Sequence, residues 1–319
     1  MCSPRSIVTH GSAMNERIRG VLAPVVTPFA ADLRPDAGRL KRHCRWLLAQ
    51  GVGLAVFGTN SEANSLSVDE RISLLDQLID GGIPPHRMMP GTGCCAISDS
   101  IRLTAHAVSR GVAGCLMLPP FYYKGVTDEG LYRNFAAIID GVGDARLRIY
   151  LYHIPPVAQV SISLGLIERL LREFPGAIAG IKDSSGDWNN TRAVLEQFAA
   201  AGFDVFAGSE LFLLANLRHG GVGCISATAN VNPAPIDRLF REWRSAGADA
   251  LQGELDAVRA IFQKRPMIAA LKASIAHWGK DAEWARVRPP LVELSPSQTS
   301  ELIADLDACA FEMPGIAQP

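Results

Sequence analysis

The sequence has no feature typical of a protein that works on nucleic acid or in a membrane. Its 31 basic residues (Lys plus Arg) and 32 acidic residues (Asp plus Glu) give a formal net charge of −1, and there is no basic block. No stretch is apolar and long enough to span a bilayer. Residues 1–19 lack the apolar core of a signal peptide. We therefore expect neither nucleic acid nor a membrane as a partner, and we expect a cytoplasmic protein.

Patterns that would bind a structural metal are also absent from the sequence. The seven cysteines are an odd number and scattered, with no Cys-x-x-Cys pair and no His/Cys cluster at zinc spacing. Cys94 and Cys95 are adjacent, but a disulfide between them is not expected. The cysteines are predicted to be free thiols in a reducing compartment, and no metal site is predicted.

What the sequence does contain is a repeated unit of short apolar strand, loop and amphipathic helix. Hydrophobic residues make up 48% of the 319 residues and charged residues 20%, which suits a globular protein with a large core. Eight such units precede residue 250. This alternation predicts parallel strands joined by right-handed crossovers. The predicted strands are Val21–Phe29, Val52–Phe57, Arg87–Pro90, Gly114–Leu118, Arg148–Ile154, the apolar run that leads into Lys182, Asp204–Ala207 and Val222–Ser226.

Eight units over roughly 230 residues match a (β/α)8 TIM barrel, an α/β fold. An open, doubly wound sheet is the alternative. That fold more often has a Gly-x-Gly-x-x-Gly turn after its first strand, and none is present there. We expect a tail at residues 1–19, the barrel at 20–247 and a C-terminal helical extension at 248–319. The extension is predicted to pack on the barrel without chemistry of its own. Its predicted helices are Leu251–Phe262, Met267–Trp278 and Ser297–Phe311.

One stretch, Ala177–Gly186, places a single lysine after an apolar run and before a turn-rich Asp-Ser-Ser-Gly. The run is short and partly β-branched, which predicts a buried strand with Lys182 at its C-terminal end. Lysine is seldom buried without a purpose, because burial disfavours its charged form. A neutral lysine amine can form a Schiff base with a carbonyl. The alternatives are a lysine that reaches solvent and an ion pair with Asp183 or Glu210.

Other polar residues follow the other predicted strands, where a barrel of this kind places its active site. Schiff-base chemistry on a 2-oxo acid needs a proton shuttle, and the hydroxyl of Tyr152 on the adjacent predicted strand suits that role. The substrate carboxylate needs a holder, and a tight turn at Gly58–Ser61 can offer backbone N–H groups. Thr59 and Tyr122 could relay the proton to solvent. The candidate substrate-binding residues are Thr59, Asn60, Ser209, Glu210 and Ser226.

Five motifs stand in order at successive predicted strand ends. They are Pro-Val-Val-Thr-Pro-Phe (24–29), Gly-Thr-Asn-Ser-Glu (58–62), Pro-Pro-Phe-Tyr-Tyr (119–123), Tyr-His-Ile-Pro (152–155) and Gly-Ile-Lys-Asp-Ser-Ser-Gly (180–186). Together they resemble the dihydrodipicolinate synthase/N-acetylneuraminate lyase family of pyruvate-dependent class I aldolases. The resemblance covers about Gly20 to Leu306, nearly the whole chain. Each motif is weak alone, whereas the order of the five makes the set specific.

The resemblance implies a role for four residues. Lys182 matches the family's Schiff-base lysine, and Tyr152 matches the tyrosine that shuttles protons at the imine. Thr59 matches a hydroxyl residue that joins the relay and helps to hold the carboxylate. Tyr122, or Tyr123 after a one-residue shift, matches a tyrosine that is lent across a subunit interface. The resemblance also implies a homotetramer built as a dimer of dimers, and no cofactor beyond the covalent lysine–substrate imine.

Two departures from the family pattern bear on the substrate. The family turn usually reads Gly-Thr-Thr-Gly-Glu or Gly-Ser-Thr-Gly-Glu, and here Asn60 replaces a hydroxyl residue and Ser61 a glycine. Dihydrodipicolinate synthases usually carry an arginine shortly after the Tyr-Asn-x-Pro motif, and here residues 156–159 contain no cation. A carboxylate of the second substrate would lose a bidentate partner there. The neutral residues predict a less acidic second substrate, unless a long side chain elsewhere supplies the charge.

The sequence therefore predicts a lyase or aldolase that acts on pyruvate or a longer 2-oxo acid. It would make or break a carbon–carbon bond through a lysine imine and enamine, with an aldehyde as the second substrate. Three alternatives stay open. They are a 4-hydroxy-tetrahydrodipicolinate synthase that joins pyruvate to aspartate semialdehyde, a dehydratase of 2-oxo sugar acids, and a non-catalytic sensor that binds a 2-oxo acid.

Overall fold

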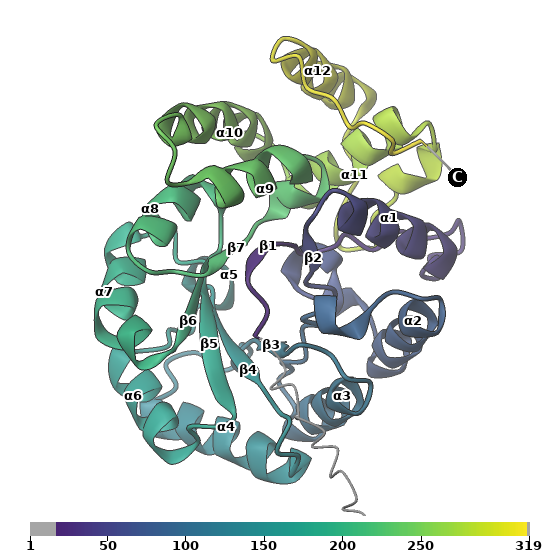
Figure 1. Ribbon diagram of the computed structural model, residues 1–319. Helices are drawn as coiled ribbons and strands as arrows, with labels where there is room; N and C mark the ends of the chain where they lie inside the picture. Colours follow the sequence, from purple (N-terminus) through teal and green to yellow (C-terminus); the bar gives the residue numbers. More distant parts are fainter. Residues whose placement is uncertain (1–16, 318–319) are drawn as a thin grey trace, which may run out of the picture.

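A curled parallel sheet, surrounded by helices, forms the centre of the computed structural model, which describes residues 17–317 (Figure 1). Short, almost wholly apolar runs form the strands because both faces of the sheet are covered. Neighbouring strands in the order β2-β1-β7-β6-β5-β4-β3 are all parallel. The strands are β1 (Gly20–Ala23), β2 (Gly53–Leu54), β3 (Cys115–Met117), β4 (Ile149–His153), β5 (Ile178–Asp183), β6 (Asp204–Ala207) and β7 (Gly223–Ile225).

The segment predicted as the third strand, Arg87–Pro90, does not form a regular strand. Met88 makes a single parallel bridge to Leu54 of β2, and Gly91 makes one to Leu116 of β3. The proline at the end of this segment has no N–H to donate, so a continuous ladder cannot form there. The segment nevertheless lies between the two outer strands and closes the sheet. The predicted (β/α)8 barrel is therefore confirmed, with this segment in the place of a regular strand.

The helices begin and end close to the predicted signals. The Ser67 hydroxyl accepts a hydrogen bond from the Glu70 amide at 3.1 Å, and the Glu70 carboxylate accepts one from the Ser67 amide at 2.8 Å, which confirms the predicted capping box. The helices are α1 (Ala37–Ala49), α2 (Val68–Asp80), α3 (Ile97–Ser109), α4 (Asp128–Val142), α5 (Pro155–Ala158), α6 (Leu164–Glu173), α7 (Trp188–Phe198), α8 (Leu213–Arg218), α9 (Pro233–Glu242), α10 (Ala248–Gln263), α11 (Met267–Gly279) and α12 (Pro296–Asp307).

The one-turn helix α5 is not expected from the sequence. Pro155 and Pro156 fill its first turn, where no N–H is needed for an intrahelical bond. Gln159 ends the helix in the left-handed backbone region, with φ of 53°. The turn brings Pro156 and Val157 to the edge of the cavity described below. Part of the loop after β4 is thus a fixed wall.

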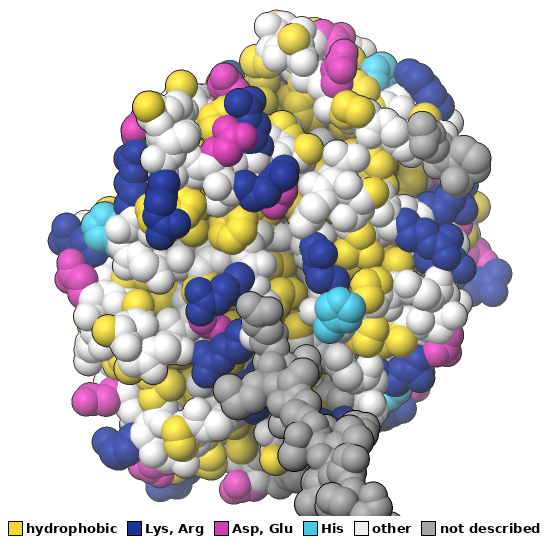
Figure 2. All heavy atoms as spheres, in the orientation of Figure 1, with side chains coloured by type: hydrophobic (Ala, Val, Ile, Leu, Met, Phe, Trp, Pro, Cys, Tyr) yellow, Lys and Arg dark blue, Asp and Glu magenta, His cyan; other side chains and the backbone are white. Residues whose placement is uncertain are grey.

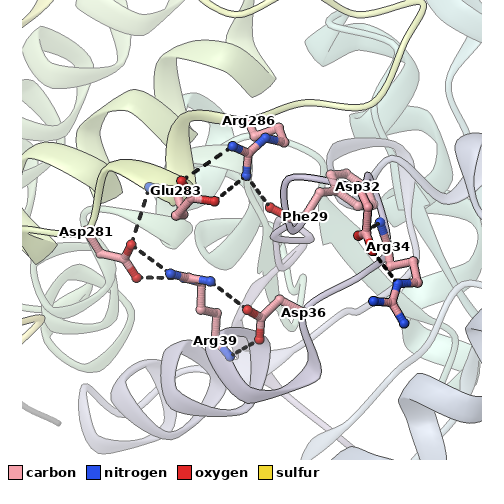
Figure 3. A network of polar contacts seen from close by, with 8 residues as sticks. All are labelled: Phe29, Asp32, Arg34, Asp36, Arg39, Asp281, Glu283 and Arg286. Atoms are coloured by element: carbon pink, nitrogen blue, oxygen red, sulfur yellow. Dashed lines mark hydrogen bonds and ion pairs between the residues drawn. The ribbon is translucent and has the colours of Figure 1, made fainter.

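Helices α10, α11 and α12 lie together beside α9 and α1 on one side of the ring (Figure 1). A polar network fastens this extension to the region where α1 begins (Figure 3). The Arg39 guanidinium bridges two carboxylates, with Nε 2.7 Å from Asp281 Oδ2 and Nη1 2.6 Å from Asp36 Oδ2. Arg286 donates from Nη1 to the carbonyl oxygen of Phe29 at 3.0 Å. Arg39 and Asp281 are 242 positions apart, so the network joins segments that are distant in the sequence.

The described cysteines agree with the expectation of free thiols. Basic and acidic side chains are both scattered over the face displayed in Figure 2. No helix within residues 17–317 has the length and apolar character needed to cross a membrane. Six cysteines are free, while Cys2 and most of the predicted tail lie outside the described residues. The free cysteines include Cys94 and Cys95, as predicted.

Candidate active site

Lys182 lies where the sequence predicts it, one residue before the C-terminal end of β5. It is 2% exposed. A cavity of about 730 Å³ opens at this end of the barrel, and Lys182 forms part of its wall. This volume lies in the range of small-molecule sites, about 300–1,000 Å³. Lys182 is thus a buried amine that borders a space large enough for a substrate.

Tyr152 lies on β4, directly beside Lys182 in the parallel register. The Lys182 Nζ is 4.2 Å from the centroid of the Tyr152 ring. Tyr152 is 4% exposed and borders the same cavity. A strand ladder has little freedom, so this pairing is fixed by the sheet itself.

Thr59 belongs to a 3₁₀ turn, η1 (Thr59–Ser61), that follows β2. The turn is closed by the Ser61 hydroxyl, which accepts from the Gly58 amide at 3.2 Å. The hydroxyls of Thr59 and Tyr152 are hydrogen-bonded at 3.2 Å. Thr59 and Asn60 both border the cavity. The structure therefore brings Lys182, Tyr152 and Thr59 together, as the sequence predicts. Lys182 lies against the ring of Tyr152, and the hydroxyl of Tyr152 is hydrogen-bonded to Thr59.

The carboxylate next to Lys182 in sequence is engaged elsewhere. Asp183 is 3% exposed and accepts hydrogen bonds from the Ser185 amide at 2.9 Å, the Asn190 amide group at 2.9 Å and the Thr191 hydroxyl at 2.7 Å. These contacts hold the turn after β5 against the start of α7. Asp183 therefore shapes the loop beside the cavity and is not an ion-pair partner of Lys182.

Glu210 is likewise paired with other groups. Its carboxylate accepts hydrogen bonds from the hydroxyls of Ser226 and Thr228, and the Glu210 amide donates to Ser226 Oγ at 3.2 Å. Glu210 is 1% exposed and Ser226 is fully buried, and neither borders the cavity. Ser209 does border it. Of the three residues predicted to contact substrate on this side, the structure thus places Ser209 at the cavity wall, with Glu210 and Ser226 behind it.

Tyr122 and Tyr123 lie away from the cavity of their own chain. They are 74% and 72% exposed, and their rings meet edge to face with centroids 5.3 Å apart. Their loop is tied to α5 by Lys124, whose Nζ donates to the carbonyl oxygen of Ala158 at 2.9 Å. Tyr122 therefore does not join Tyr152 and Thr59 within one chain.

His153 stands next to Tyr152 on β4 and is 4% exposed. Its Nδ1 accepts a hydrogen bond from the Ile162 amide at 3.0 Å. Burial lowers the pKa of His153, while the nearby Asp183 carboxylate acts in the opposite direction. His153 therefore orients the segment that follows α5 as a neutral acceptor.

The helical extension supplies part of the cavity wall, which the sequence analysis misses. Arg259 and Gln263 of α10 border the cavity, and so do Leu291 and Val292 of the segment before α12. One signal was available in the sequence. Arg259 stands four positions after Leu255, on the apolar side of the α10 pattern, where a charged side chain is out of place.

Within residues 17–317, no group of three or more His, Cys, Asp or Glu side chains is placed to hold a metal ion. The polar side chains at the cavity carry an amine, hydroxyls, two amide groups, a guanidinium and the carboxylate of Asp183, which is bonded to its own donors. This set suits covalent binding of a carbonyl together with hydrogen bonding to oxygen atoms.

Comparison with known proteins gives a consistent result. The model of the dihydrodipicolinate synthetase family matches residues 17–309. A DapA-like lyase of Chloroflexus aurantiacus, described as uncharacterized, is 33% identical over 293 residues, which are 90% of this chain and 95% of that protein. The crystal structure of dihydrodipicolinate synthase from Agrobacterium tumefaciens has a TM-score of 0.85 at 32% identity, covering 92% of this chain and 99% of that one. YagE, a prophage protein of the same family from E. coli solved in complex with pyruvate, has a TM-score of 0.83 at 26% identity, with 92% and 99% covered.

Proposed function

Because the chain belongs to the dihydrodipicolinate synthetase family, it is a lyase of the class I aldolase type, and we propose that Lys182 forms its Schiff base. One observation carries this proposal. Lys182 is buried at the wall of the cavity, beside Tyr152, and the neighbouring carboxylates Asp183 and Glu210 are bonded to other groups. Within residues 17–317 such an amine has no ion pair to break before it reacts.

The reaction begins when the neutral amine of Lys182 attacks C2 of a 2-oxo acid. Loss of water from the carbinolamine leaves a protonated imine, which withdraws electrons from C2. A proton then leaves C3, and an enamine forms. The enamine adds to an aldehyde carbon, or, in the opposite direction, arises when the C3–C4 bond of a longer 2-oxo acid breaks.

Tyr152 moves the protons of these steps, with Thr59 as its hydrogen-bonded neighbour. The tyrosine ring lies against the amine, so its hydroxyl can serve both the departing water and the C3 proton.

The carboxylate of the 2-oxo acid binds at the η1 turn. The first N–H groups of a helical turn have no acceptor within the turn. In η1 these are the amides of Thr59 and Asn60, whereas the next amide, of Ser61, donates to the Gly58 carbonyl oxygen at 3.1 Å. Thr59 and Asn60 also border the cavity. Two backbone donors beside Lys182 can hold a carboxylate while C2 faces the amine.

We further propose that the protein is a cytoplasmic homotetramer, built as a dimer of dimers. Two exposed tyrosines side by side, Tyr122 and Tyr123, are typical of a protein–protein interface. In this assembly Tyr122 would complete the proton relay of a neighbouring copy. Sedimentation of the native protein and of Tyr122→Ala tests the proposal. A wild-type monomer that is fully active would contradict it.

The decisive experiment is to trap the imine. The protein is incubated with pyruvate and reduced with borohydride, and its peptides are weighed. We expect a pyruvate-sized adduct on the peptide that carries Lys182. The peptide that carries Lys272, the other buried lysine, is the internal control and should stay unmodified. Pyruvate bound without an adduct on Lys182 would contradict the proposal and favour a non-catalytic sensor of 2-oxo acids.

A second candidate is the 4-hydroxy-tetrahydrodipicolinate synthase reaction, since a solved relative at 32% identity is a dihydrodipicolinate synthase. The neutral residues Pro156 and Val157 beside the cavity speak against it. A coupled assay with pyruvate and aspartate semialdehyde separates the two. A third candidate, dehydration of a 2-oxo sugar acid, would release water from such an acid without releasing pyruvate.

A further inference from the structure

A second cavity lies between the barrel and the helical extension, away from the active site. Its volume is about 330 Å³, at the lower end of the range of small-molecule sites, about 300–1,000 Å³. Among the described residues, none lines both cavities. Helix α1 contributes four side chains at spacings of three and four positions, which place them on one face of the helix. They are Arg39, Arg42, His43 and Trp46.

Three aromatic rings meet at this cavity. The His43 ring is stacked on Trp46, with centroids 5.5 Å apart and planes 20° apart. It is tilted against Trp284 of the 3₁₀ turn η7 (Ala282–Ala285), with centroids 5.1 Å apart. The indole N–H of Trp46 is already used, because it donates to the carbonyl oxygen of Pro314 at 2.9 Å. The π faces of these rings favour a ligand that is itself a flat ring.

The polar atoms of His43 lack partners. The residue is 2% exposed, and its Nδ1 and Nε2 are both buried. Within residues 17–317 neither nitrogen has a hydrogen-bond partner. Burial lowers the pKa of His43 to about 3, so the ring is neutral at physiological pH and has one N–H donor and one acceptor. An unpaired buried polar group is costly, so its retention points to a partner.

The neighbouring Asn230 does not supply that partner. Its side chain is close enough to oppose the effect of burial on the pKa of His43, yet no hydrogen bond joins the two. Asn230 Oδ1 accepts from the Val26 amide at 3.0 Å. Its Nδ2 donates to the carbonyl oxygens of Pro24 and Ala227, at 3.0 and 2.9 Å. The partner of His43 therefore has to come from outside residues 17–317.

The charged groups at this cavity balance one another. Arg39 is held between the carboxylates of Asp36 and Asp281 (Figure 3). Arg42, one residue before His43, adds a second positive charge to the wall. Two guanidinium groups thus match two carboxylates. A neutral ligand suits such a site, because an ion would lose its hydration without gaining an unmatched opposite charge.

We propose that this cavity is a second binding site, and that its ligand is a small neutral aromatic heterocycle with both a ring N–H and a ring acceptor atom. The ring packs against Trp46 and Trp284. Its donor and acceptor match whichever nitrogen of His43 it meets. The site is separate from the proposed function, because Lys182 and its neighbours take no part in it.

Three bicyclic probes of nearly equal size test the proposal without knowledge of the natural ligand. Benzimidazole has an N–H and a ring acceptor, indole has the N–H alone, and indene has neither. Calorimetry with the full chain, at a pH at which benzimidazole is neutral, gives the three dissociation constants. We expect benzimidazole to bind about 10-fold more tightly than indene, with indole between them, as hydrogen bonds to a buried group allow. Equal affinities, or no binding of benzimidazole, would overturn the proposal.

His43→Phe keeps a flat ring in the wall and removes both nitrogens. It should weaken benzimidazole binding by about 10-fold and abolish the preference over indene. A preference that survives in this variant would overturn the proposal. If His43→Phe does not fold, Trp284→Leu removes one aromatic wall and should weaken all three probes by a similar factor, and unchanged constants would count against the site. The matched control is Val157→Ser at the active-site cavity, which should leave the three constants unchanged. A loss of binding there would assign the probes to the active site and refute the second one.

Discussion

Two lysines are buried among the residues that the structure describes, and their surroundings are opposite. Lys272 of α11 is fully buried, and its Nζ lies 2.6 Å from Glu62 Oε1. Glu62 Oε2 accepts from the Arg288 amide at 2.8 Å, so both carboxylate oxygens are used. Lys182 borders a cavity and lies against Tyr152, while the carboxylates near it are bonded to other groups.

The difference shows that burial alone does not make a lysine reactive. Burial lowers the pKa of Lys272, while the Glu62 carboxylate beside it acts in the opposite direction. Lys272 is also outside the lining of the cavity, whereas Lys182 forms part of it. The Lys272–Glu62 pair instead links the extension to the residue that ends η1, the turn that carries Thr59. Lys182 is placed to react with a substrate, whereas Lys272 helps to hold the η1 turn beside the cavity in position.

The largest effect is expected from Lys182→Ala. Exchange of the C3 protons of pyruvate with deuterated water reports enamine formation without a second substrate. We expect the exchange rate, followed by NMR, to fall by at least about 10⁴-fold, because no other amine can form the imine. Lys272→Met is the matched control and should keep the exchange while it remains folded. Exchange that persists in Lys182→Ala would contradict the assignment of Lys182 as the lysine that forms the imine.

Lys272→Met should act on stability instead. It leaves Glu62 with an unpaired buried charge, which typically costs about 3–5 kcal/mol of unfolding free energy. Urea unfolding followed by circular dichroism measures the loss. The double variant Lys272→Met/Glu62→Gln should recover part of it, since no lone charge remains. Additive losses in the double variant would show that the pair is not coupled.

Tyr152→Phe tests whether the surroundings of Lys182 supply the proton transfer that its reaction needs. It keeps the ring against the amine and removes the hydroxyl that moves protons. We expect exchange of the pyruvate protons to slow by about 100-fold or more. Thr59→Val, which removes the 3.2 Å partner of that hydroxyl, should have a smaller effect. An unchanged rate in Tyr152→Phe would assign the shuttle to another group.

The smallest effect concerns pH. His153, on the strand beside Lys182, has a pKa lowered by burial, and burial also lowers the pKa of His43, in this case to about 3. The unfolded chain takes up protons near the ordinary histidine pKa of about 6.5, whereas the folded chain does not. Unfolding free energy should therefore be constant above that pH and fall as the pH falls below it.

His153→Asn provides the check on that dependence, because an asparagine oxygen can still accept from the Ile162 amide. The melting temperature is measured between pH 7 and pH 5. It should fall less with falling pH in the variant than in the wild type, and His43 should account for the fall that remains. A slope identical to that of the wild type would mean that His153 does not contribute.

Local features of the fold could be read from the sequence because they depend on neighbours in the chain. The alternation of strands and helices and the Ser67–Glu70 capping box are of this kind. The sequence predicts a strand at Arg87–Pro90, because its apolar residues are typical of a buried strand. The structure has only isolated bridges there, since the proline cannot donate a hydrogen bond to a neighbouring strand. The α5 turn was missed, because two prolines indicate the end of a strand as well as the start of a helix.

The sequence by itself determined the barrel and the place of Lys182, Tyr152 and Thr59, because strand periodicity and strand ends are local properties and parallel strands bring their ends together. Only the tertiary structure decided which buried charges are paired. Lys272 and Glu62 are 210 positions apart, and Arg259 reaches the cavity from a helix beyond the eight repeated units. No periodic pattern in the sequence identifies the ion-pair partner of a charged residue. Its state depends on the groups that packing brings within a few ångströms, and these come from anywhere along the chain.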